Sequence, residues 1–471
     1  MTTASTTDSP VAEPEDAVPA TPDSLWHNVD FLKFWFGETL SLFGSHVTVL
    51  ALPLTAVIVF NASDEQVGLL RFLQLVPYLG LALLLGLWVD RVRRRPVMIA
   101  ANVVRLVLIA SVPVLYWLDL LNMVTLLVIA CLVGVASVAF DVSWMSYVPA
   151  LVKDPKHYVE ANSKLGTTSS AADVAGPGIA GLLVSALTAP VAMIVDAFSF
   201  LASVVSLLLI RTPEAPPKPA TERRHLLREL RDGLVWVFGN RILRPLALVA
   251  PFCNFSLVTV WTMFLLFAVR DVGLNPATVG LVLSAASVGG LAGAAASRKL
   301  IKRFPIGLVY AVSMSAIFVS PLLIPLAAGP APVQVGVFIV SFFLSYGGLG
   351  VAGVVMISLR QTCTPPSLMG RMNAAFRTVL FGGGSLGGLF AGILAGAFGP
   401  RDAITGAAIG SALVVIGLVI SPVSRLKEMP PAATEADRTG APPEPTPDEP
   451  APAGTAAAEA GAAGSGADDA R

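Results

Sequence analysis

Four acidic side chains lie inside long apolar stretches of this chain. Glu38, Asp141, Asp173 and Asp196 all fall in the first half of the 471 residues. An ionisable group within an apolar segment is costly and is usually retained for a purpose. Each carboxyl group is therefore a candidate for carrying a proton or binding a polar substrate. The alternative for each is a structural salt bridge or a hydrogen bond between helices.

Further polar residues follow two of these acids at helical spacing. Ser41 and Ser45 follow Glu38, and Ser199 follows Asp196, so that each set shares one face of a helix. A polar face does not belong against lipid. The spacing therefore indicates either a water-filled cavity or an interface between helices.

The cations Arg105 and Arg377 and the histidine His46 also lie within apolar stretches. Arg105 needs an acid or backbone carbonyl groups as a partner, and we expect Asp141 or Asp173 to supply it. Asp141 lies near the end of its stretch, which favours pairing with a basic neighbour. His46 is interpreted as a polar packing residue, with a proton relay as the alternative.

The composition indicates that these residues sit in a lipid bilayer. Hydrophobic residues make up 55% of the chain and charged residues 13%, whereas soluble domains carry about 25% charged residues. A helix that crosses a bilayer needs about 20 apolar residues. Twelve stretches satisfy this length, which predicts an all-α protein that crosses the membrane twelve times. They are 31–58, 66–89, 97–118, 123–146, 159–186, 189–210, 244–268, 276–297, 306–328, 333–358, 369–397 and 403–424.

The two halves of the chain resemble each other. Asn162 and Gly176 recur 211 positions later as Asn373 and Gly387. Two related bundles of six helices are the architecture by which many transporters build a binding site between the halves. We expect the bundles to cover 25–210 and 244–427.

The remaining segments are polar. We expect tails 1–24 and 428–471 to be disordered because they are rich in Pro, Ala and acidic residues. The central loop 211–243 contains an amphipathic pattern over 223–240 that suits a helix on the membrane surface.

Basic residues lie almost entirely on one side of the predicted membrane. They cluster between the second and third segments, in the central loop, and between the eighth and ninth segments. Because positive loops stay in the cytoplasm, both termini are predicted to be cytoplasmic. The formal net charge of zero argues against binding of nucleic acid.

The turn between the second and third segments carries a recognisable motif. Gly86 precedes Asp90 and Arg91 by four and five residues, and Arg94 belongs to the basic run that follows. This resembles a signature of the major facilitator superfamily. Asp90 can accept charge-assisted hydrogen bonds from the other bundle and so latch one conformation. The alternative is that the cluster only sets the orientation in the membrane.

A second motif lies on the fifth segment. Gly176, Pro177 and Gly181 present small side chains and a helix-weakening proline. This resembles the antiporter signature of the same superfamily, which marks exporters among its members. Ordinary close packing of the helix is the alternative reading.

Over about 25–425 the chain resembles the drug:proton antiporter-3 group of this superfamily, which includes macrolide efflux proteins and an enterobactin exporter. The resemblance implies proton-coupled efflux of a small amphipathic or hydrophobic compound across the cytoplasmic membrane by a protein that needs no cofactor or metal. We expect a monomer.

The alternatives are an uptake carrier of the same fold and a non-transporting receptor or assembly factor. An enzyme is disfavoured, since the spanning segments lack clustered His and Cys residues. The absence of a Gly-x4-Gly-Lys-Ser/Thr phosphate loop argues against transport driven by the protein's own ATP hydrolysis.

Overall fold

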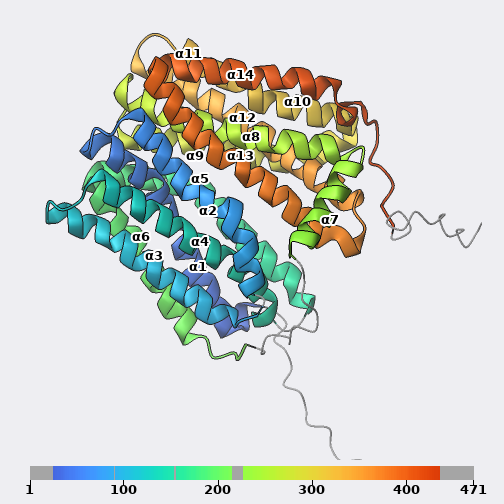
Figure 1. Ribbon diagram of the computed structural model, residues 1–471, viewed down its shortest axis with the longest axis horizontal. Helices are drawn as coiled ribbons and strands as arrows, with labels where there is room; N and C mark the ends of the chain where they lie inside the picture. Colours follow the sequence, from blue (N-terminus) through green and yellow to red (C-terminus); the bar gives the residue numbers. More distant parts are fainter. Residues whose placement is uncertain (1–24, 90, 153–154, 215–225, 435–471) are drawn as a thin grey trace, which may run out of the picture.

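A computed structural model describes residues 25–89, 91–152, 155–214 and 226–434 of the chain. In these residues all regular structure is helical (Figure 1). The predicted tail 1–24, Asp90 and most of the second tail lie outside the described residues.

Six long helices form the first half and six helical segments form the second. The first half contains α1 (Val29–Leu54, extended by the π-helical turn Thr55–Val59), α2 (Asp64–Val89), α3 (Arg94–Trp117), α4 (Met123–Leu151), α5 (Tyr158–Leu187) and α6 (Ala189–Leu209). The second contains α8 (Leu243–Arg270), α9 (Pro276–Arg303), α10 (Ile306–Val319) continued by Ser320–Leu322 and α11 (Leu323–Leu326), α12 (Ala331–Thr362), α13 (Met369–Phe398) and α14 (Pro400–Ile420).

These helices make a protein that spans the membrane many times. Within the described residues, eleven are long and apolar enough to cross a bilayer, and α2 runs beside them with 26 residues. This is consistent with the twelve crossings expected. Helices suit this environment because they satisfy every interior backbone group without water. Asparagines begin three of them: Asn28, Asn122 and Asn275 each accept a hydrogen bond from the amide three residues later, at 2.8–3.0 Å.

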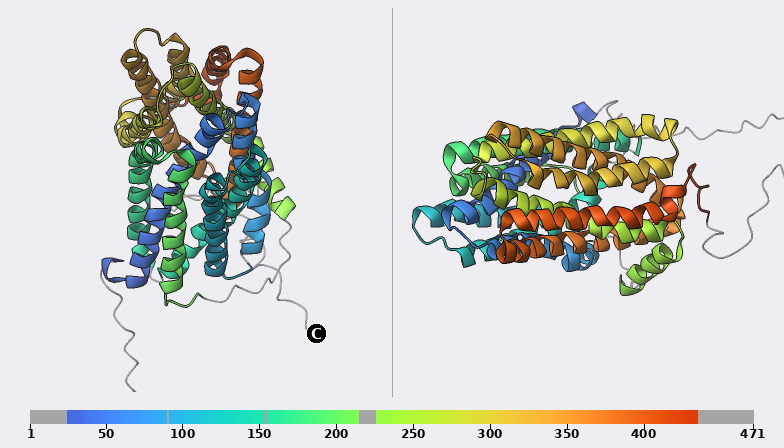
Figure 2. Two further views of the ribbon diagram at one scale, coloured as in Figure 1. Left: turned by 90° about the vertical axis from the view of Figure 1, so that its left-hand side faces the viewer. Right: turned by 90° about the horizontal axis from the view of Figure 1, so that it is seen from above.

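The helices gather into two bundles (Figure 2). In the first, α6 packs on α1 and α3, and α4 packs on α2 and α3. In the second, α12 packs on α9 and α10, and α8 packs on α13 and α14. The bundles touch mainly through α2 against α13 and α5 against α9. These four helices therefore form the main contact between the halves.

The repeat extends to backbone conformation. Thr188 joins α5 to α6 with φ 78° and ψ 156°, and Gly399 joins α13 to α14 with φ 81° and ψ 156°. These residues are 211 positions apart. Glycine alone adopts this region without strain, so the first half maintains the turn with a strained threonine.

Helix α7 (Leu226–Gly239) occupies the central loop, where an amphipathic helix is predicted. Leu230, Leu234 and Val237 pack into the core of the second bundle, and Arg371 forms an ion pair with Asp232 at 3.2 Å. The helix therefore docks on the second bundle rather than lying only on the membrane surface.

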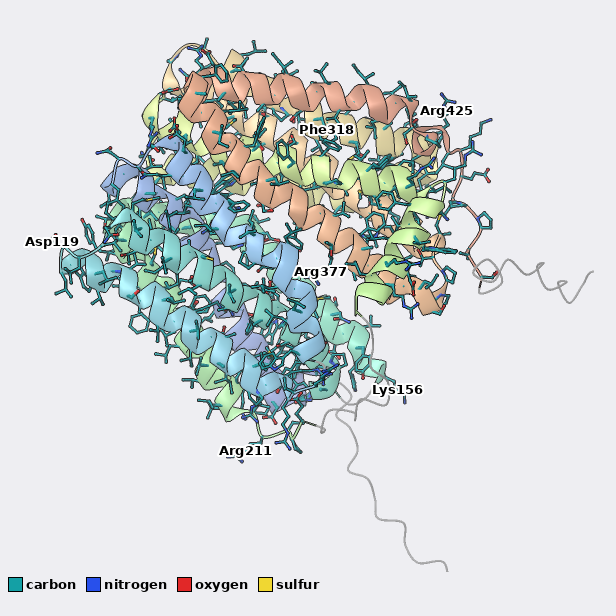
Figure 3. The ribbon with its side chains drawn as sticks, in the orientation of Figure 1. Asp119, Lys156, Arg211, Phe318, Arg377 and Arg425 are labelled. Carbon is teal, nitrogen blue, oxygen red and sulfur yellow. The ribbon has the colours of Figure 1, made fainter. Side chains whose placement is uncertain are left out.

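The bundles close against each other at one end. A Cβ on Gly68 of α2 would lie 2.5 Å from the Cα of Gly392 on α13, so the two backbones are in direct contact. Arg270 binds Asp64 and the carbonyl of Ala62 at the same end. Lys156, Arg211 and Arg425 lie at the opposite end (Figure 3). If those basic residues mark the cytoplasm, as predicted, the closed end is extracellular.

The strained junction makes a stability prediction. We expect Thr188→Gly to raise the free energy of unfolding by about 1 kcal/mol, because strain of about 1–3 kcal/mol is relieved while the added chain entropy of glycine costs about 0.5–1. Gly399→Ala is expected to destabilise the protein by about 1–3 kcal/mol. Thermal unfolding in detergent measures both. Gly406→Ala, in open space on α14, is the control, and equal behaviour of all three variants would contradict the prediction.

The glycine contact makes a conformational prediction. Gly68→Ala places a methyl group against the α13 backbone, so we expect the closed end to open. Spin labels at the exposed residues Leu120 and Ala331, one in each bundle at that end, should report longer distances by pulsed electron resonance. Gly417→Ala, with nothing near its Cβ position, is the control. An unchanged distance distribution in Gly68→Ala would show that the contact does not hold this state.

Candidate functional site

A cavity of about 640 Å³ lies between the bundles and is called here the central cavity. Its walls come from α1, α2 and α5 on one side and from α8, α9, α12 and α13 on the other. Most of the lining is apolar. The polar side chains that line it are His46, Arg71, Ser170, Asp173, Asn254, Ser287 and Tyr346.

A second space of about 630 Å³ lies between α2, α4, α12 and α13 and is called the vestibule. Phe381 lines both spaces, and its ring stacks on Tyr78 of the other bundle with centroids 4.9 Å apart. The predicted motif residue Gly86 and the cation Arg377 line the vestibule. The stacked rings therefore stand where the two spaces meet.

Asp173 and His46 form a pair in the wall of the central cavity. His46 Nε2 lies 3.3 Å from Asp173 Oδ1, and the Asp173 side chain is 61% exposed. Gly176 makes room for this pair, because a Cβ there would lie 2.5 Å from His46 Cδ2. The pair brings two groups that can exchange protons to a solvent-accessible surface.

The other residues of the helix 5 motif have distinct positions. Pro177 lines the central cavity. Gly181 lies against the backbone of α9, where a Cβ would approach the Pro276 carbonyl oxygen to 2.5 Å. The small residues of the motif therefore serve close contacts on two sides, one within the first bundle and one between bundles.

A third ionisable residue lines the cavity, Arg71 on α2, which is not among the site residues predicted from the sequence. Its Nη1 donates to Gln74 Oε1 at 3.1 Å, and its guanidinium lies 4.6 Å from the ring centroid of Trp261 on α8. The signal for it was present: a cation within an apolar stretch, the same signal that singled out Arg105.

Most of the predicted cavity residues lie instead inside the first bundle. Asp196 is fully buried and accepts hydrogen bonds from Thr48 and, at 2.9 Å, from Ser199. Glu38 and Ser41 are buried on the facing side of α1. Of the two readings of the polar stripes, the interface between helices is the one observed. Glu38 and Asp196 do not line the cavity that Asp173 lines, and their role in proton coupling or substrate binding stays a prediction.

The interface depends on small residues. A Cβ on Gly44 would lie within 2.7 Å of Asp196 Oδ1 and of Ser199 Oγ, and a Cβ on Gly37 would lie 2.0 Å from Ser206 Oγ. Glycines on α1 therefore admit the polar side chains of α6. Ser45 is half-buried and does not line the central cavity.

Arg105 has different partners from those predicted. Its Nη2 donates to Asn102, and the guanidinium lies between the rings of Phe140 and Phe200, 4.3 and 4.5 Å from their centroids. Asp173 pairs with His46, and Asp141 accepts a hydrogen bond from Tyr78 at 2.8 Å. Among the described residues Arg105 forms no ion pair with either acid.

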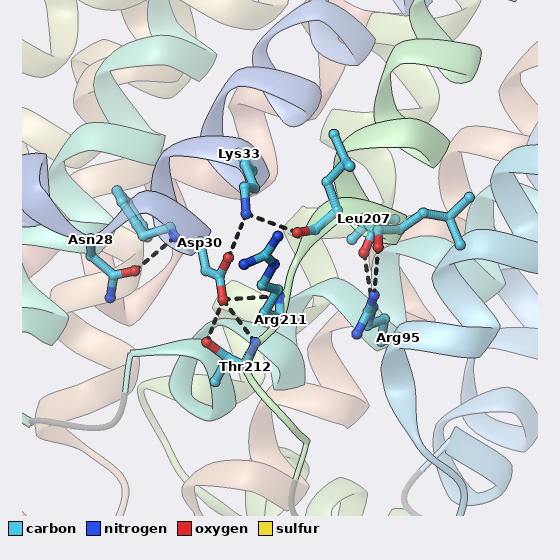
Figure 4. Close-up of polar contacts among 10 residues, drawn as sticks. Asn28, Asp30, Lys33, Arg95, Leu207, Arg211 and Thr212 are labelled. Carbon is cyan, nitrogen blue, oxygen red and sulfur yellow. Dashed lines mark hydrogen bonds and ion pairs between the residues drawn. The ribbon is translucent and has the colours of Figure 1, made fainter.

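The basic turn contacts its own bundle. Glu214 accepts hydrogen bonds from the backbone amides of Arg94 and Arg95 at 2.8 and 3.1 Å. Arg95 donates through Nε to the carbonyl of Leu207 at 2.8 Å (Figure 4). Arg91 is exposed. Asp90, the acid of the predicted latch, lies outside the described residues, so the latch stays a prediction.

Two six-helix bundles around a central cavity that is closed at one end are the architecture of many secondary transporters. Residues 34–388 match the sequence model of the Major Facilitator Superfamily. The chain belongs to that superfamily, whose members are transporters and not enzymes.

Relatives support this assignment. The chain is 26% identical over 398 residues to the multidrug efflux pump Tap of Mycolicibacterium fortuitum, covering 82% of this chain and 93% of Tap. It is 26% identical over 295 residues to the enterobactin exporter EntS of Escherichia coli O1:K1 / APEC, covering 61% of this chain and 67% of EntS.

Solved structures share the fold. The nucleoside transporter NupG superposes with a TM-score of 0.67 at 11% identity, covering 83% of this chain and 99% of NupG. A bacterial homologue of the human lysosomal transporter Spinster, in an inward-facing and unoccupied conformation, gives 0.64 at 15% identity, covering 86% of this chain and 97% of the homologue.

The buried network predicts a stability effect. Asp196→Ala removes the carboxylate that accepts hydrogen bonds from Thr48 and Ser199. Ser199 keeps the backbone carbonyl of residue 196 as an acceptor, whereas the Thr48 hydroxyl loses its acceptor, and a buried group left without a partner costs about 1–3 kcal/mol. We expect a loss of stability of that size in detergent-solubilised protein. Thr405→Ala, which removes a hydroxyl bonded to a carbonyl within α14, should change little. Equal stability of the two variants would contradict a structural role for Asp196.

Proposed function

We propose that this transporter is a proton-coupled exporter of a small amphipathic or hydrophobic organic compound, working as a monomer in the cytoplasmic membrane. The observation that carries the proposal is the exposed carboxyl group of Asp173 in the central cavity, beside His46 on another helix. An acid that solvent and substrate can both reach is what coupling by alternating access requires.

The proton would supply the driving force. One positive charge that enters down a membrane potential releases about 2.3 kcal/mol per 100 mV. In our proposal Asp173 holds a proton taken from the outside and releases it inward, while His46 shares or relays it.

The other intramembrane acids are secondary candidates for the coupling group. Glu38 and Asp196 are buried within the first bundle. Asp141 is half-buried and bonded to Tyr78. None of these three residues lines the central cavity, so substrate bound there does not touch them.

Size and lining support the substrate class. The central cavity, at about 640 Å³, falls within the range of about 300–1,000 Å³ that is typical of sites for drug-sized ligands. Trp261, Tyr346 and Phe381 provide aromatic surface, with leucines between them. Tap is named as an efflux pump and EntS as an exporter, and the helix 5 motif resembles that of antiporters. Both observations favour export over uptake.

The proposal predicts a coupling defect. Cells that lack their own pumps and express this protein should retain less of a fluorescent amphipathic dye, and a protonophore should abolish the difference. Asp173→Asn should lose proton-driven efflux by about tenfold or more while dye exchange in proteoliposomes persists, because the cavity stays intact and only the proton site is lost. Asp402→Asn, at an exposed acid of α14, is the control.

Three outcomes would count against the proposal. Retention that expression does not change, across a panel of dyes and antibiotics, would remove the case for export. Efflux that persists with the protonophore would remove proton coupling. If Glu38→Gln, and not Asp173→Asn, separates exchange from proton-driven efflux, the coupling group is Glu38 and lies within the first bundle.

A further inference from the structure

Arg71 is a cation in the wall of the central cavity without an acidic partner. In the part of the chain that the structure describes, no carboxylate lies within ion-pair distance of its guanidinium, and its side-chain hydrogen bond goes to the neutral Gln74. The Nε atom is buried and has no hydrogen-bond partner. A charge within a membrane protein is normally paired, so this position calls for an anion.

Two other arginines of the bundles, Arg270 and Arg105, have partners that Arg71 lacks. Arg270 is paired with Asp64, and Arg105 is 6% exposed and enclosed by two aromatic rings and Asn102. Arg71 alone of these three lines the central cavity. The acid that shares the cavity, Asp173, is in contact with His46. The negative charge that Arg71 lacks is therefore not supplied by the protein's described residues.

The guanidinium is held in place from both bundles. The stem of Arg71 lies against Gly388 of α13, where a Cβ would approach Arg71 Cγ to 3.0 Å. The planar head lies over Trp261 of α8, at 4.6 Å. A fixed guanidinium presents its donors as a fork that matches the two oxygens of a carboxylate. Because Gly388 and Trp261 belong to the opposite bundle, movement of the bundles would alter this pocket.

We propose that Arg71 is the anion-binding group of the central cavity, and that the transported compound carries an oxyanion such as a carboxylate beside an aromatic or apolar body. The oxyanion pairs with the Arg71 guanidinium, and the apolar body lies against Trp261, Tyr346 and Phe381. This inference rests on the proposed function, because it takes the central cavity as the site that binds the transported compound.

A pair of fluorescent probes of nearly equal shape tests the inference: anthracene-9-carboxylate and the neutral anthracene-9-carboxamide. Each is titrated into the purified full-length protein. We expect the wild-type protein to bind the carboxylate at least about tenfold more tightly than the carboxamide, since a charge-assisted bond exceeds a neutral one. Arg71→Gln should weaken carboxylate binding about tenfold to a hundredfold and leave carboxamide binding within about twofold.

Two further variants serve as controls, one for the shape of the cation at position 71 and one for the loss of a positive charge elsewhere. Arg71→Lys keeps the charge but loses the planar fork, so its carboxylate affinity should fall between those of the wild type and Arg71→Gln. Arg298→Gln removes an exposed cation near the end of α9 and should bind both probes like the wild type. Arg71→Lys also keeps the test valid if Arg71→Gln does not fold.

The inference is overturned if the wild-type protein does not bind the carboxylate, if it binds both probes equally, or if the Arg71 variants keep its preference. Export of the carboxylate from proteoliposomes under a proton gradient is measured in parallel. Selective binding without export would uphold the anion site and count against the proposed function alone.

Discussion

Backbone contact between the two bundles at one end is the constraint on which the rest of the structure depends. Gly68 lies against Gly392, and Gly181 against Gly280, so α2 meets α13 and α5 meets α9 without intervening side chains. In lipid, helices associate through close packing and small residues allow it. Contact at this end leaves the central cavity and the vestibule between the other halves of the same helices. These four glycines therefore permit the backbone contacts that close this end.

Polar residues of the first bundle divide into two sets with different roles. One set lies in the interface between α1 and α6. Asp196 accepts hydrogen bonds from Thr48 of α1 and from Ser199 of its own helix, and glycines on α1 leave room for these side chains. The other set, Asp173, His46 and Arg71, faces the central cavity. A polar group within a membrane protein must find a partner, and the first set finds it within the bundle. The second set lies where solvent and a bound compound can reach it.

The two bundles share a backbone conformation at the repeated turn but differ in the side chains that they bring to the cavity. Thr188 and Gly399 repeat one turn with nearly identical dihedral angles, while the four intramembrane acids all belong to the first half. The second bundle contributes aromatic surface instead, with Trp261, Tyr346 and Phe381 in the cavity wall. Charge on one side and aromatic surface on the other suit a ligand that has both a polar and an apolar part. The duplication thus supplies a scaffold on which the halves diverged.

The sequence by itself determined the membrane-spanning helices, their repeat and the family motifs, because these are encoded in runs of apolar residues and in glycine spacing. It also named Asp173, as one of four acids within apolar stretches. Which face of each helix meets the cavity depends on how α1, α5 and α6 rotate against one another, and this only the tertiary structure decided. Glu38 and Asp196 resemble Asp173 in sequence, yet packing buries them. Arg71 lies in the cavity wall against Trp261 and Gly388 of the other bundle. Such contacts join residues from opposite halves of the chain, and local spacing carries no information about them.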